Sequence, residues 1–404
     1  MKKHLIAAAV AGAFAVPAMA QVTVSGNLNL NAISNSKTSD QASSTTATET
    51  VKASASGGHG WTASELRISG SEDLGGGLKA DFVAAVDLRN DTGWGPNRDT
   101  NIALSGGFGT VRIGRFVPAP ALGYHGYTGR VTTNQGGSTY GLATATTATT
   151  FNNFGNATAG SFERDSNRLQ FSTPNMSGFV AHVYYSSSKR DNNLATATGQ
   201  AKTEQTGLSV VYTAGPLSVA AATNDRKVDR EAVAGTAGTC IATASGTTSI
   251  VAAGATCGTG LVRLTGTNPT ANQKVKGDLD WFGGSYNLGV ATLSAAHLKR
   301  KDVTTTAAGV SGTNSDIRMN VLGVTVPAGA ATLSVSVYQG KNKQSALATD
   351  DTKLSGHQLN ATYSLSKRTM IYAAMGEAQV KRDSGNTGAS LKFTSNAIGV
   401  MHSF

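Results

Sequence analysis

Apolar and polar residues alternate one by one over many short segments of this chain. In residues 22–33, the positions Val22, Val24, Leu28 and Leu30 share one parity, and threonine, serine and asparagine occupy the other. A repeat of two residues is typical of a β-strand with one apolar and one polar face. The segment therefore predicts a strand that separates an apolar environment from water.

Fifteen later segments show a similar pattern, and most are paired by tight turns. Gly75-Gly76-Gly77 and Gly106-Gly107 are two of these turns, and glycine supplies the positive φ angles that tight hairpins require. The later strands are expected at residues 62–72, 78–88, 100–105, 108–116, 166–173, 178–187, 205–213, 217–224, 278–287, 289–299, 317–326, 331–340, 356–365, 369–379 and 392–404.

The connections between the expected strands alternate between short and long. Residues 34–60, 117–163 and 225–276 have no periodicity and are expected to be long loops. Strands of roughly 9–11 residues cross a bilayer at a tilt, and outer-membrane barrels have tight turns at one end and long loops at the other. We therefore predict an all-β fold, a transmembrane antiparallel β-barrel of 16 strands. A soluble β-sandwich, solenoid or adhesin also alternates, but it does not require this succession of turns and loops.

The first twenty residues have the order of a secretory signal peptide. A basic start is followed by the uncharged apolar run 5–16, by Pro17, and by the small-residue cleavage site Ala18-Met19-Ala20. A membrane anchor is disfavoured because a spanning helix needs roughly 20 apolar residues. The sequence thus predicts a signal peptide at 1–20 and a barrel domain at 21–404, exported through the periplasm to a bacterial outer membrane.

Composition agrees with a barrel and argues against other classes of function. Hydrophobic residues make up 39% and charged residues 14%, as expected where only every second residue is apolar. The formal net charge is +10, but basic residues do not cluster with aromatic ones, so no nucleic-acid partner is expected. The histidines are scattered, and no nucleophile elbow, phosphate-binding loop or metal-binding pair is present. We expect neither an enzyme nor a cofactor.

Two further features concern the loops and the end of the chain. Cys240 and Cys257 are the only cysteines, and in an oxidising periplasm we expect them to form a disulfide. A metal site is the weaker alternative, because two thiolates need two more ligands. Ile398, Val400 and Phe404 share one face of the last strand, and we expect this strand, ending in Phe404, to act as an assembly signal.

Several longer motifs make a family resemblance specific. They are Val22-Thr-Val-Ser-Gly26, the segments 66–80 (LRISGSEDLGGGLKA) and 104–115 (LSGGFGTVRIGR), Tyr363–Thr369 and Ile398–Phe404. In these motifs the chain resembles the Gram-negative trimeric porins of the β-proteobacterial type, as in Neisseria, Bordetella and Burkholderia. The resemblance implies a sixteen-stranded barrel, a homotrimer, and a third loop, residues 117–163, that folds into the lumen as a constriction.

The same resemblance places arginines along the pore wall at Arg67, Arg98 and Arg164. Arg67 is also expected in the lumen from the pattern alone, because Leu66 and Ile68 take the lipid side. Its alternative role is a structural ion pair with Glu65 or Glu72. Arg98 has the parity of the lipid-facing residues, so it needs a bulge or a strand end to turn inward. Arg112 is expected to face the lumen, and Arg130 is the only charged residue between Arg115 and Glu163.

The balance of charge in the expected pore predicts an anion preference. Residues 117–162 contain no Asp or Glu, and Ala85 stands where related porins commonly have an acidic residue, although Asp87 follows two positions later. A narrow throat with few carboxylates attracts anions. We expect a general diffusion channel for small anions and polar solutes, in contact with outer-membrane lipid and lipopolysaccharide. A substrate-specific channel for phosphate or organic acids remains an alternative, as does a surface adhesin or receptor.

Overall fold

Sixteen antiparallel strands form a closed barrel in the computed structural model. The structure describes residues 21–39, 50–54, 64–89, 93–95, 98–118, 165–190, 201–230, 238–242, 248–251, 261–263, 273–306, 311–343, 351–383 and 390–404. The barrel strands are β1 (Gln21–Ser39), β3 (Glu65–Gly75), β4 (Leu78–Arg89), β6 (Thr100–Gly106), β7 (Gly109–Phe116), β8 (Asp165–Ser172), β9 (Phe179–Arg190), β10 (Ala201–Ala214), β11 (Leu217–Arg230), β15 (Gln273–Asn287), β16 (Thr292–Thr306), β17 (Ser311–Ala328), β18 (Ala331–Lys343), β19 (Asp351–Ser364), β20 (Thr369–Asp383) and β21 (Ser390–Ser403).

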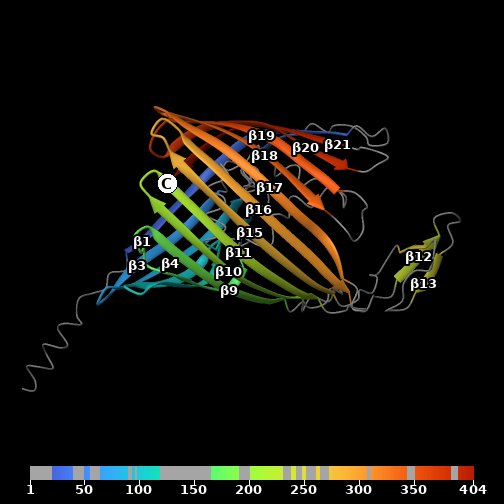
Figure 1. Cartoon of the computed structure of the whole chain (residues 1–404), viewed down its shortest axis with the longest axis horizontal. Helices are drawn as coiled ribbons and strands as arrows, with labels where there is room; N and C mark the ends of the chain where they lie inside the picture. Colours follow the sequence, from blue (N-terminus) through green and yellow to red (C-terminus); the bar gives the residue numbers. More distant parts are fainter. Residues whose placement is uncertain are drawn as a thin grey trace, which may run out of the picture.

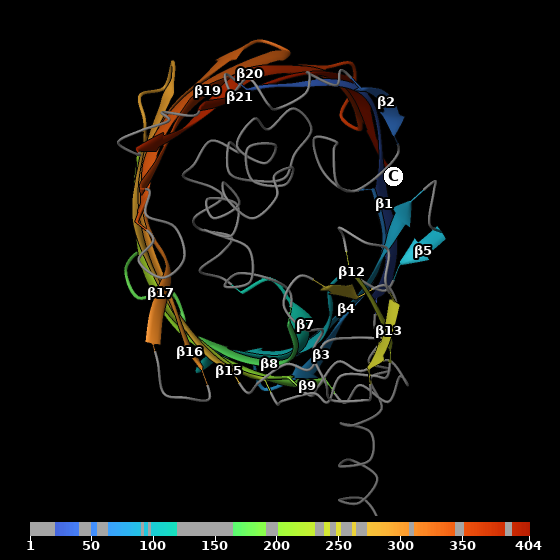
Figure 2. The same ribbon diagram turned by 90° about the vertical axis from the view of Figure 1, so that its right-hand side faces the viewer.

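The first and last strands close the barrel. β1 pairs antiparallel with β3 on one side and with β21 on the other. The terminal residue adds to this seam, because Phe404 and Gly26 exchange two backbone hydrogen bonds of 3.0 Å. Figure 1 shows the tilted strands from the side, and Figure 2 shows them as a ring seen along the barrel. The sixteen-strand prediction is confirmed; the role of Phe404 as an assembly signal stays a prediction.

Five shorter strands accompany the barrel. β2 (Thr50–Ser54) continues the sheet beside β1, and β5 (Gly93–Gly95) pairs with the end of β4. β12 (Gly238–Ala242), β13 (Thr248–Val251) and β14 (Leu261–Arg263) form a separate small sheet, which lies beyond one end of the barrel in Figure 1. The expectation that 34–60 and 225–276 are loops throughout is therefore wrong in part.

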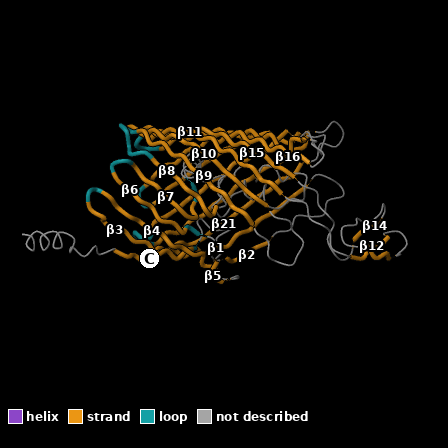
Figure 3. The backbone as a smooth tube through the Cα atoms, turned by 90° about the horizontal axis from the view of Figure 1, so that it is seen from below, coloured by secondary structure: helices purple, strands orange, loops and turns teal. Residues whose placement is uncertain are grey.

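Most barrel strands are longer at the end with the long loops than the alternation predicted. β1 runs to Ser39 instead of residue 33, and β17 begins at Ser311 instead of residue 317. Beyond the hydrocarbon layer the outward face needs no apolar residues, so the backbone pairing continues after the alternation stops. The tube in Figure 3 shows this long strand network, and no described helix is long and apolar enough to cross a membrane.

The outward face carries the apolar belt that lipid requires. Val24, Ile102, Phe282 and Ile398 are all about 60% exposed in the single chain and have the parity expected for the lipid side. Side chains of the other parity point inward and are mostly polar, including the buried Asn29, Gln170, Ser209 and Asn360. The two faces of the predicted strands are thus confirmed in this part of the barrel.

The inner face departs from this rule on the half of β15–β20 that lies toward the long loops. A cluster of buried apolar side chains lies there, which we call the inner apolar cluster: Leu279, Trp281, Leu298, Ile317, Met319, Val321, Tyr338, Leu354, Ala378 and Val380, continued by Ala220, Ala222 and Ala296. The prediction of a polar inner face is wrong for this wall. Val117, the first residue of the expected constriction loop, packs against the cluster. Residues 119–164 lie outside the described part, so the folded-in loop stays a prediction.

A tyrosine that lies across a glycine recurs on the inner face. Tyr372 on β20 is directly opposite Gly399 on β21, and its ring lies where a Cβ of residue 399 would come within 2.4 Å. Its hydroxyl donates to Asn29 Oδ1 at 2.8 Å and accepts from Asn31 Nδ2 at 3.2 Å on β1. The side chain therefore ties three strands together at the closing seam, and glycine leaves room for the ring.

The same arrangement occurs on β9 to β11. Tyr184 is opposite Gly207, which is opposite Asn224, and the Tyr184 hydroxyl donates to Asn224 Oδ1 at 2.6 Å. A Cβ at position 207 would lie 2.2 Å from the Tyr184 ring. These tyrosines fix neighbouring strands in register on the inner face of the barrel.

Candidate channel lining

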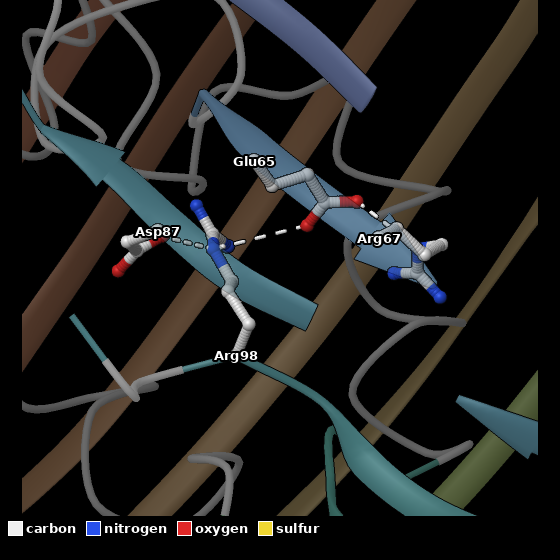
Figure 4. Close-up of polar contacts among 4 residues, drawn as sticks. All are labelled: Glu65, Arg67, Asp87 and Arg98. Atoms are coloured by element: carbon white, nitrogen blue, oxygen red, sulfur yellow. Dashed lines mark hydrogen bonds and ion pairs between the residues drawn. The ribbon is translucent and has the colours of Figure 1, made fainter. Parts of the chain in front are cut away.

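Two arginines and two carboxylates form a network on the inner side of β3 and β4 (Figure 4). Glu65 and Asp87 are directly opposite each other across the two strands. Arg67 Nε lies 3.2 Å from Glu65 Oε1, and Arg98 Nε lies 3.8 Å from Glu65 Oε2. Arg98 also donates from Nε to Asp87 Oδ1. The Glu65 carboxylate thus lies between the two guanidinium groups.

Local backbone geometry explains how both arginines reach this network. Arg67 alternates with the outward Leu66 and Ile68, as predicted. Arg98 lies in a bend two residues before β6 begins, so the parity of that strand does not apply to it. Arg98 was expected to need a bulge or a strand end to turn inward. The bend before β6 meets this need and turns the Arg98 side chain toward Asp87.

The network has no net charge, which alters the expected role of these arginines. The side chains of Glu65, Asp87 and Arg98 are at most 17% exposed, whereas that of Arg67 is 32% exposed. Ionised groups with so little water are costly unless they are paired, so the carboxylates hold the arginines in place. The structural pairing of Arg67 with Glu65, weighed as an alternative, is confirmed as a contact. The two arginines contribute less free positive potential than the sequence alone suggests.

A second group of arginines on β7 and β8 is held by aromatic rings. The Arg112 guanidinium carbon lies 5.4 Å from the centre of the Phe116 ring, and that of Arg168 lies 5.7 Å from the same centre. Arg168 also lies 4.9 Å from the centre of the Tyr184 ring and donates from Nη1 to the carbonyl oxygen of Phe116. Cation–π contacts of this kind contribute about 0.5–2 kcal/mol each.

Arg112 is a lumen cation whose charge no described carboxylate compensates. It is directly opposite the buried, inward Ala103 and is itself partly exposed. His182 lies nearby on the inner face of β9, with its Nδ1 2.8 Å from Ser172 Oγ. Among the described residues, no carboxylate lies within ion-pair distance of Arg112. An aromatic contact leaves the full unit charge available to ions in the lumen.

A third charged group, an arginine–aspartate ion pair, lies on the inner face of β16. Arg300 binds Asp302 through two contacts, Nε to Oδ2 at 2.8 Å and Nη2 to Oδ1 at 3.1 Å. Gly277 lies opposite Asp302, and a Cβ there would lie 2.6 Å from Asp302 Oδ1. The pair is buried and self-neutralising, so it has the character of a structural contact of the wall.

The predicted site residues are only partly within the described chain. Arg67, Arg98 and Arg112 are described and line the inner wall, whereas Arg130 and Arg164 lie outside the described residues. Cys257 also lies outside them, and Cys240 is on β12 with no description of its side chain, so the disulfide stays a prediction.

Sequence reasoning missed the Arg168–Phe116–Arg112 stack. One signal was available: Leu169 is 45% exposed on the lipid side, and strict alternation then turns Arg168 inward. The contact with Phe116 was not readable, because it depends on how β7 pairs with β8, and the register of that pair shifts between Gly114–Arg168 and Phe116–Asp165. Phe116 itself has the parity of Arg112, so alternation from the outward Ile113 already turns it inward.

Comparisons with known proteins agree with this geometry. The family model described as Gram-negative porin matches residues 7–383. Outer membrane porin protein 32 of Delftia acidovorans is 28% identical over 373 residues, which cover 86% of each chain. Major outer membrane protein P.IB of Neisseria meningitidis serogroup A is 37% identical over 118 residues, or 28% of this chain and 34% of the relative.

Solved structures show the same fold. The anion-selective porin from Comamonas acidovorans aligns with a TM-score of 0.60 at 22% identity and covers 95% of this chain and all of the other. OmpT of Vibrio cholerae, in its trimer form, aligns with a TM-score of 0.58 at 13% identity and covers 95% of this chain and 99% of the other. With a sixteen-stranded barrel, an apolar outer belt and a charged lumen, the chain belongs to the Gram-negative porin family and is an outer-membrane channel.

Proposed function

We propose that this porin passes small hydrophilic solutes by diffusion and prefers anions. The single observation that carries the proposal is Arg112, a partly exposed lumen cation held by the Phe116 ring, with no carboxylate at ion-pair distance among the described residues. A fixed positive charge in a channel of low dielectric raises the local concentration of anions. The absence of acidic residues from 117–162 supports the same sign.

The aromatic support of Arg112 favours weak, non-specific attraction over tight binding. A site that binds phosphate tightly usually offers several free guanidinium donors to one anion. Arg67 and Arg98 are already engaged by Glu65 and Asp87. We therefore expect anions to be enriched in the pore and released again without saturation.

Swelling of liposomes that contain the refolded porin tests this proposal. Swelling rates are expected to fall smoothly with solute size, and an anion is expected to enter faster than a cation of similar size. Titration of phosphate into a chloride current is the companion measurement. Block at micromolar phosphate would replace general diffusion by a specific anion site, the alternative function.

A homotrimer is the assembly we propose for the channel. The family resemblance supports it, as does the trimer form recorded for OmpT. Current steps that occur in groups of three in planar bilayers, together with a trimer-sized band in unheated detergent gels, are the expected results. Single, ungrouped steps from a monomeric band would contradict this assembly. Lipopolysaccharide in the outer leaflet is a further proposed partner.

Removing the carboxylate between two arginines is expected to strengthen anion preference. In the described network, the Glu65→Gln substitution leaves Asp87 as the remaining carboxylate. We expect the chloride-to-potassium permeability ratio to rise by about two- to fivefold at low salt.

The matched control for Glu65→Gln is Glu377→Gln, which removes a carboxylate that pairs with Lys392 at 2.7 Å on the outer wall. The control is expected to leave the reversal potential unchanged. If both variants shift it equally, the effect comes from net charge and not from the pore wall.

A further inference from the structure

A series of hydrogen bonds on β8 and β9 ends at a histidine in the lumen wall. Gln170 Nε2 donates to Ser172 Oγ at 3.2 Å, and Ser172 Oγ lies 2.8 Å from His182 Nδ1. Ser172 is directly opposite His182 on β9, and Gln170 is directly opposite Arg112 on β7. The series therefore runs along the same inner wall as Arg112.

His182 faces the lumen and is accessible to pore water. Val183 and Tyr185, its neighbours of the other parity on β9, are exposed on the lipid side, whereas Tyr184 is buried on the inner side. His182 shares the parity of Tyr184 and is partly exposed. A histidine side chain ordinarily changes its charge between about pH 5 and pH 8. The lumen wall therefore contains a group whose charge responds to the pH of the medium.

The hydrogen bonds of Ser172 suit both charge states of His182. A hydroxyl group donates one hydrogen bond and accepts two. When His182 is neutral, the Ser172 hydroxyl accepts from Gln170 and donates to Nδ1, which assigns the imidazole proton to Nε2. When His182 is protonated, Nδ1–H donates to the second acceptor site of Ser172 Oγ, and the hydroxyl proton turns away. The strands need not move, so protonation changes the charge of the wall and leaves its shape unchanged.

The charged groups near His182 on the described inner wall are positive. Arg112 lies on β7 and Arg168 on β8, while Tyr184 is the adjacent titratable group on β9. On β10 the residue directly opposite His182 is Ser209, and the inner face of that strand carries no charged residue. Among the described residues, no carboxylate lies within ion-pair distance of His182. A proton on His182 thus adds to the existing positive field of the wall.

We propose that His182 is a titratable selectivity residue of the channel. Its protonation places a second fixed positive charge beside Arg112 and strengthens the attraction of anions as the medium becomes more acidic. Two strand spacings of about 4.8 Å and two residues of about 3.3 Å separate His182 from Arg112, so their backbones are about 12 Å apart. The inference rests on the proposed channel function and adds a dependence on pH to it.

The size of the effect follows from Coulomb's law. One unit charge about 10 Å from a permeating ion, at an effective dielectric constant of about 40, changes the local ion concentration about fourfold. We therefore expect the chloride-to-potassium permeability ratio of the wild type to rise at least about fourfold between pH 8 and pH 5. The rise is expected to be largest at low salt, where screening is weak.

The test is the reversal potential of the refolded full-length porin in planar bilayers under a KCl gradient, measured from pH 8 to pH 5. His182→Gln removes the titratable group and keeps a side chain that can accept a hydrogen bond from Ser172. His182→Lys carries a positive charge over the whole range. The matched control is His297→Gln, because His297 lies on the outward face of β16 with its Nδ1 2.8 Å from Asn320 Oδ1.

The variants are expected to separate by their pH profiles. The wild type and His297→Gln show the same rise in the permeability ratio on acidification. His182→Gln keeps the wild-type value of pH 8 at every pH, and His182→Lys has the wild-type value of pH 5 already at pH 8. The gel mobility of unheated protein checks that each barrel is folded, and the lysine variant decides alone if the glutamine variant does not fold. A merely structural His182 would lower the unfolding midpoint of His182→Gln and leave its pH profile unchanged.

Three outcomes would overturn the proposal. The wild-type ratio does not change between pH 8 and pH 5, or His182→Gln retains the rise, or His182→Lys has the wild-type ratio at pH 8. Any of them in a channel that prefers chloride at pH 8 would leave the proposed channel function intact. A wild type that prefers potassium at pH 8, and shifts toward chloride only where His182 is present, would contradict the proposed anion preference and support the role of His182.

Discussion

The Arg112→Glu substitution is expected to turn the anion preference of the channel into a cation preference. Arg112 faces the lumen on β7, its guanidinium group lies over the Phe116 ring, and no carboxylate among the described residues is within ion-pair distance of it. Coulomb's law gives about 2 kcal/mol for a two-unit charge change about 7 Å from a permeating ion at an effective dielectric constant of about 40. The chloride-to-potassium permeability ratio is expected to fall at least about tenfold at low salt, where screening is weak.

Two variants control for side effects of this substitution. Arg112→Lys keeps the charge and is expected to keep the sign of the reversal potential. Arg318→Glu makes the same two-unit change on the outer wall and is expected to leave selectivity unaltered. A wild-type reversal potential in Arg112→Glu, in a correctly folded trimer, would show that this residue does not control selectivity.

The Gly399→Val substitution is expected to prevent the barrel from closing. The ring of Tyr372 occupies the place of the new side chain, with 2.4 Å between the ring and the position of the Cβ. Displacing the ring overpacks a buried site and breaks the contacts of its hydroxyl with Asn29 and Asn31, so we expect a loss of about 3–5 kcal/mol. The measurement is the urea midpoint of refolding, followed by the shift in gel mobility between heated and unheated protein.

The chain offers a matched glycine and a rescue variant for this prediction. Gly107 lies in the turn between β6 and β7 with no atom within 4 Å of its would-be Cβ, so Gly107→Val is expected to have little effect. In the double variant Gly399→Val/Tyr372→Ala the clash is gone, and part of the stability is expected to return as a non-additive effect. Equal losses in the single and double variants would place the defect elsewhere.

The alternation of apolar and polar residues predicted the strands well within the apolar belt, where one face of each strand contacts lipid. All sixteen strands were found because each must place apolar residues such as Leu28 and Leu322 toward lipid and polar ones toward the lumen. Beyond the belt this constraint ends. Lys299 and Arg318 take the outward positions there, while Leu298 and Ile317 point inward and are buried. The strand ends were therefore placed too early, and the inner apolar cluster was not foreseen.

The residues that line the pore were predictable only where the alternation within a single strand sets the direction of the side chain. Arg67 and Arg112 follow from the parity of their neighbours, and both face the lumen. The contact of Arg98 with Asp87 depends on a bend before β6 and on the approach of two strands, which no local pattern contains. The stack of Arg168 on Phe116 depends on the register shift near Gly114 for the same reason.

The sign of ion selectivity tests the central claim most directly. The measurement is the reversal potential of the wild-type porin in a planar bilayer under a KCl gradient at low ionic strength. A potential of the sign set by chloride is the predicted result, because Arg112 stands uncompensated in the described lumen wall while Arg67 and Arg98 are matched by Glu65 and Asp87. A potential of the sign set by potassium would leave the protein a porin but would contradict the proposed basis of its selectivity.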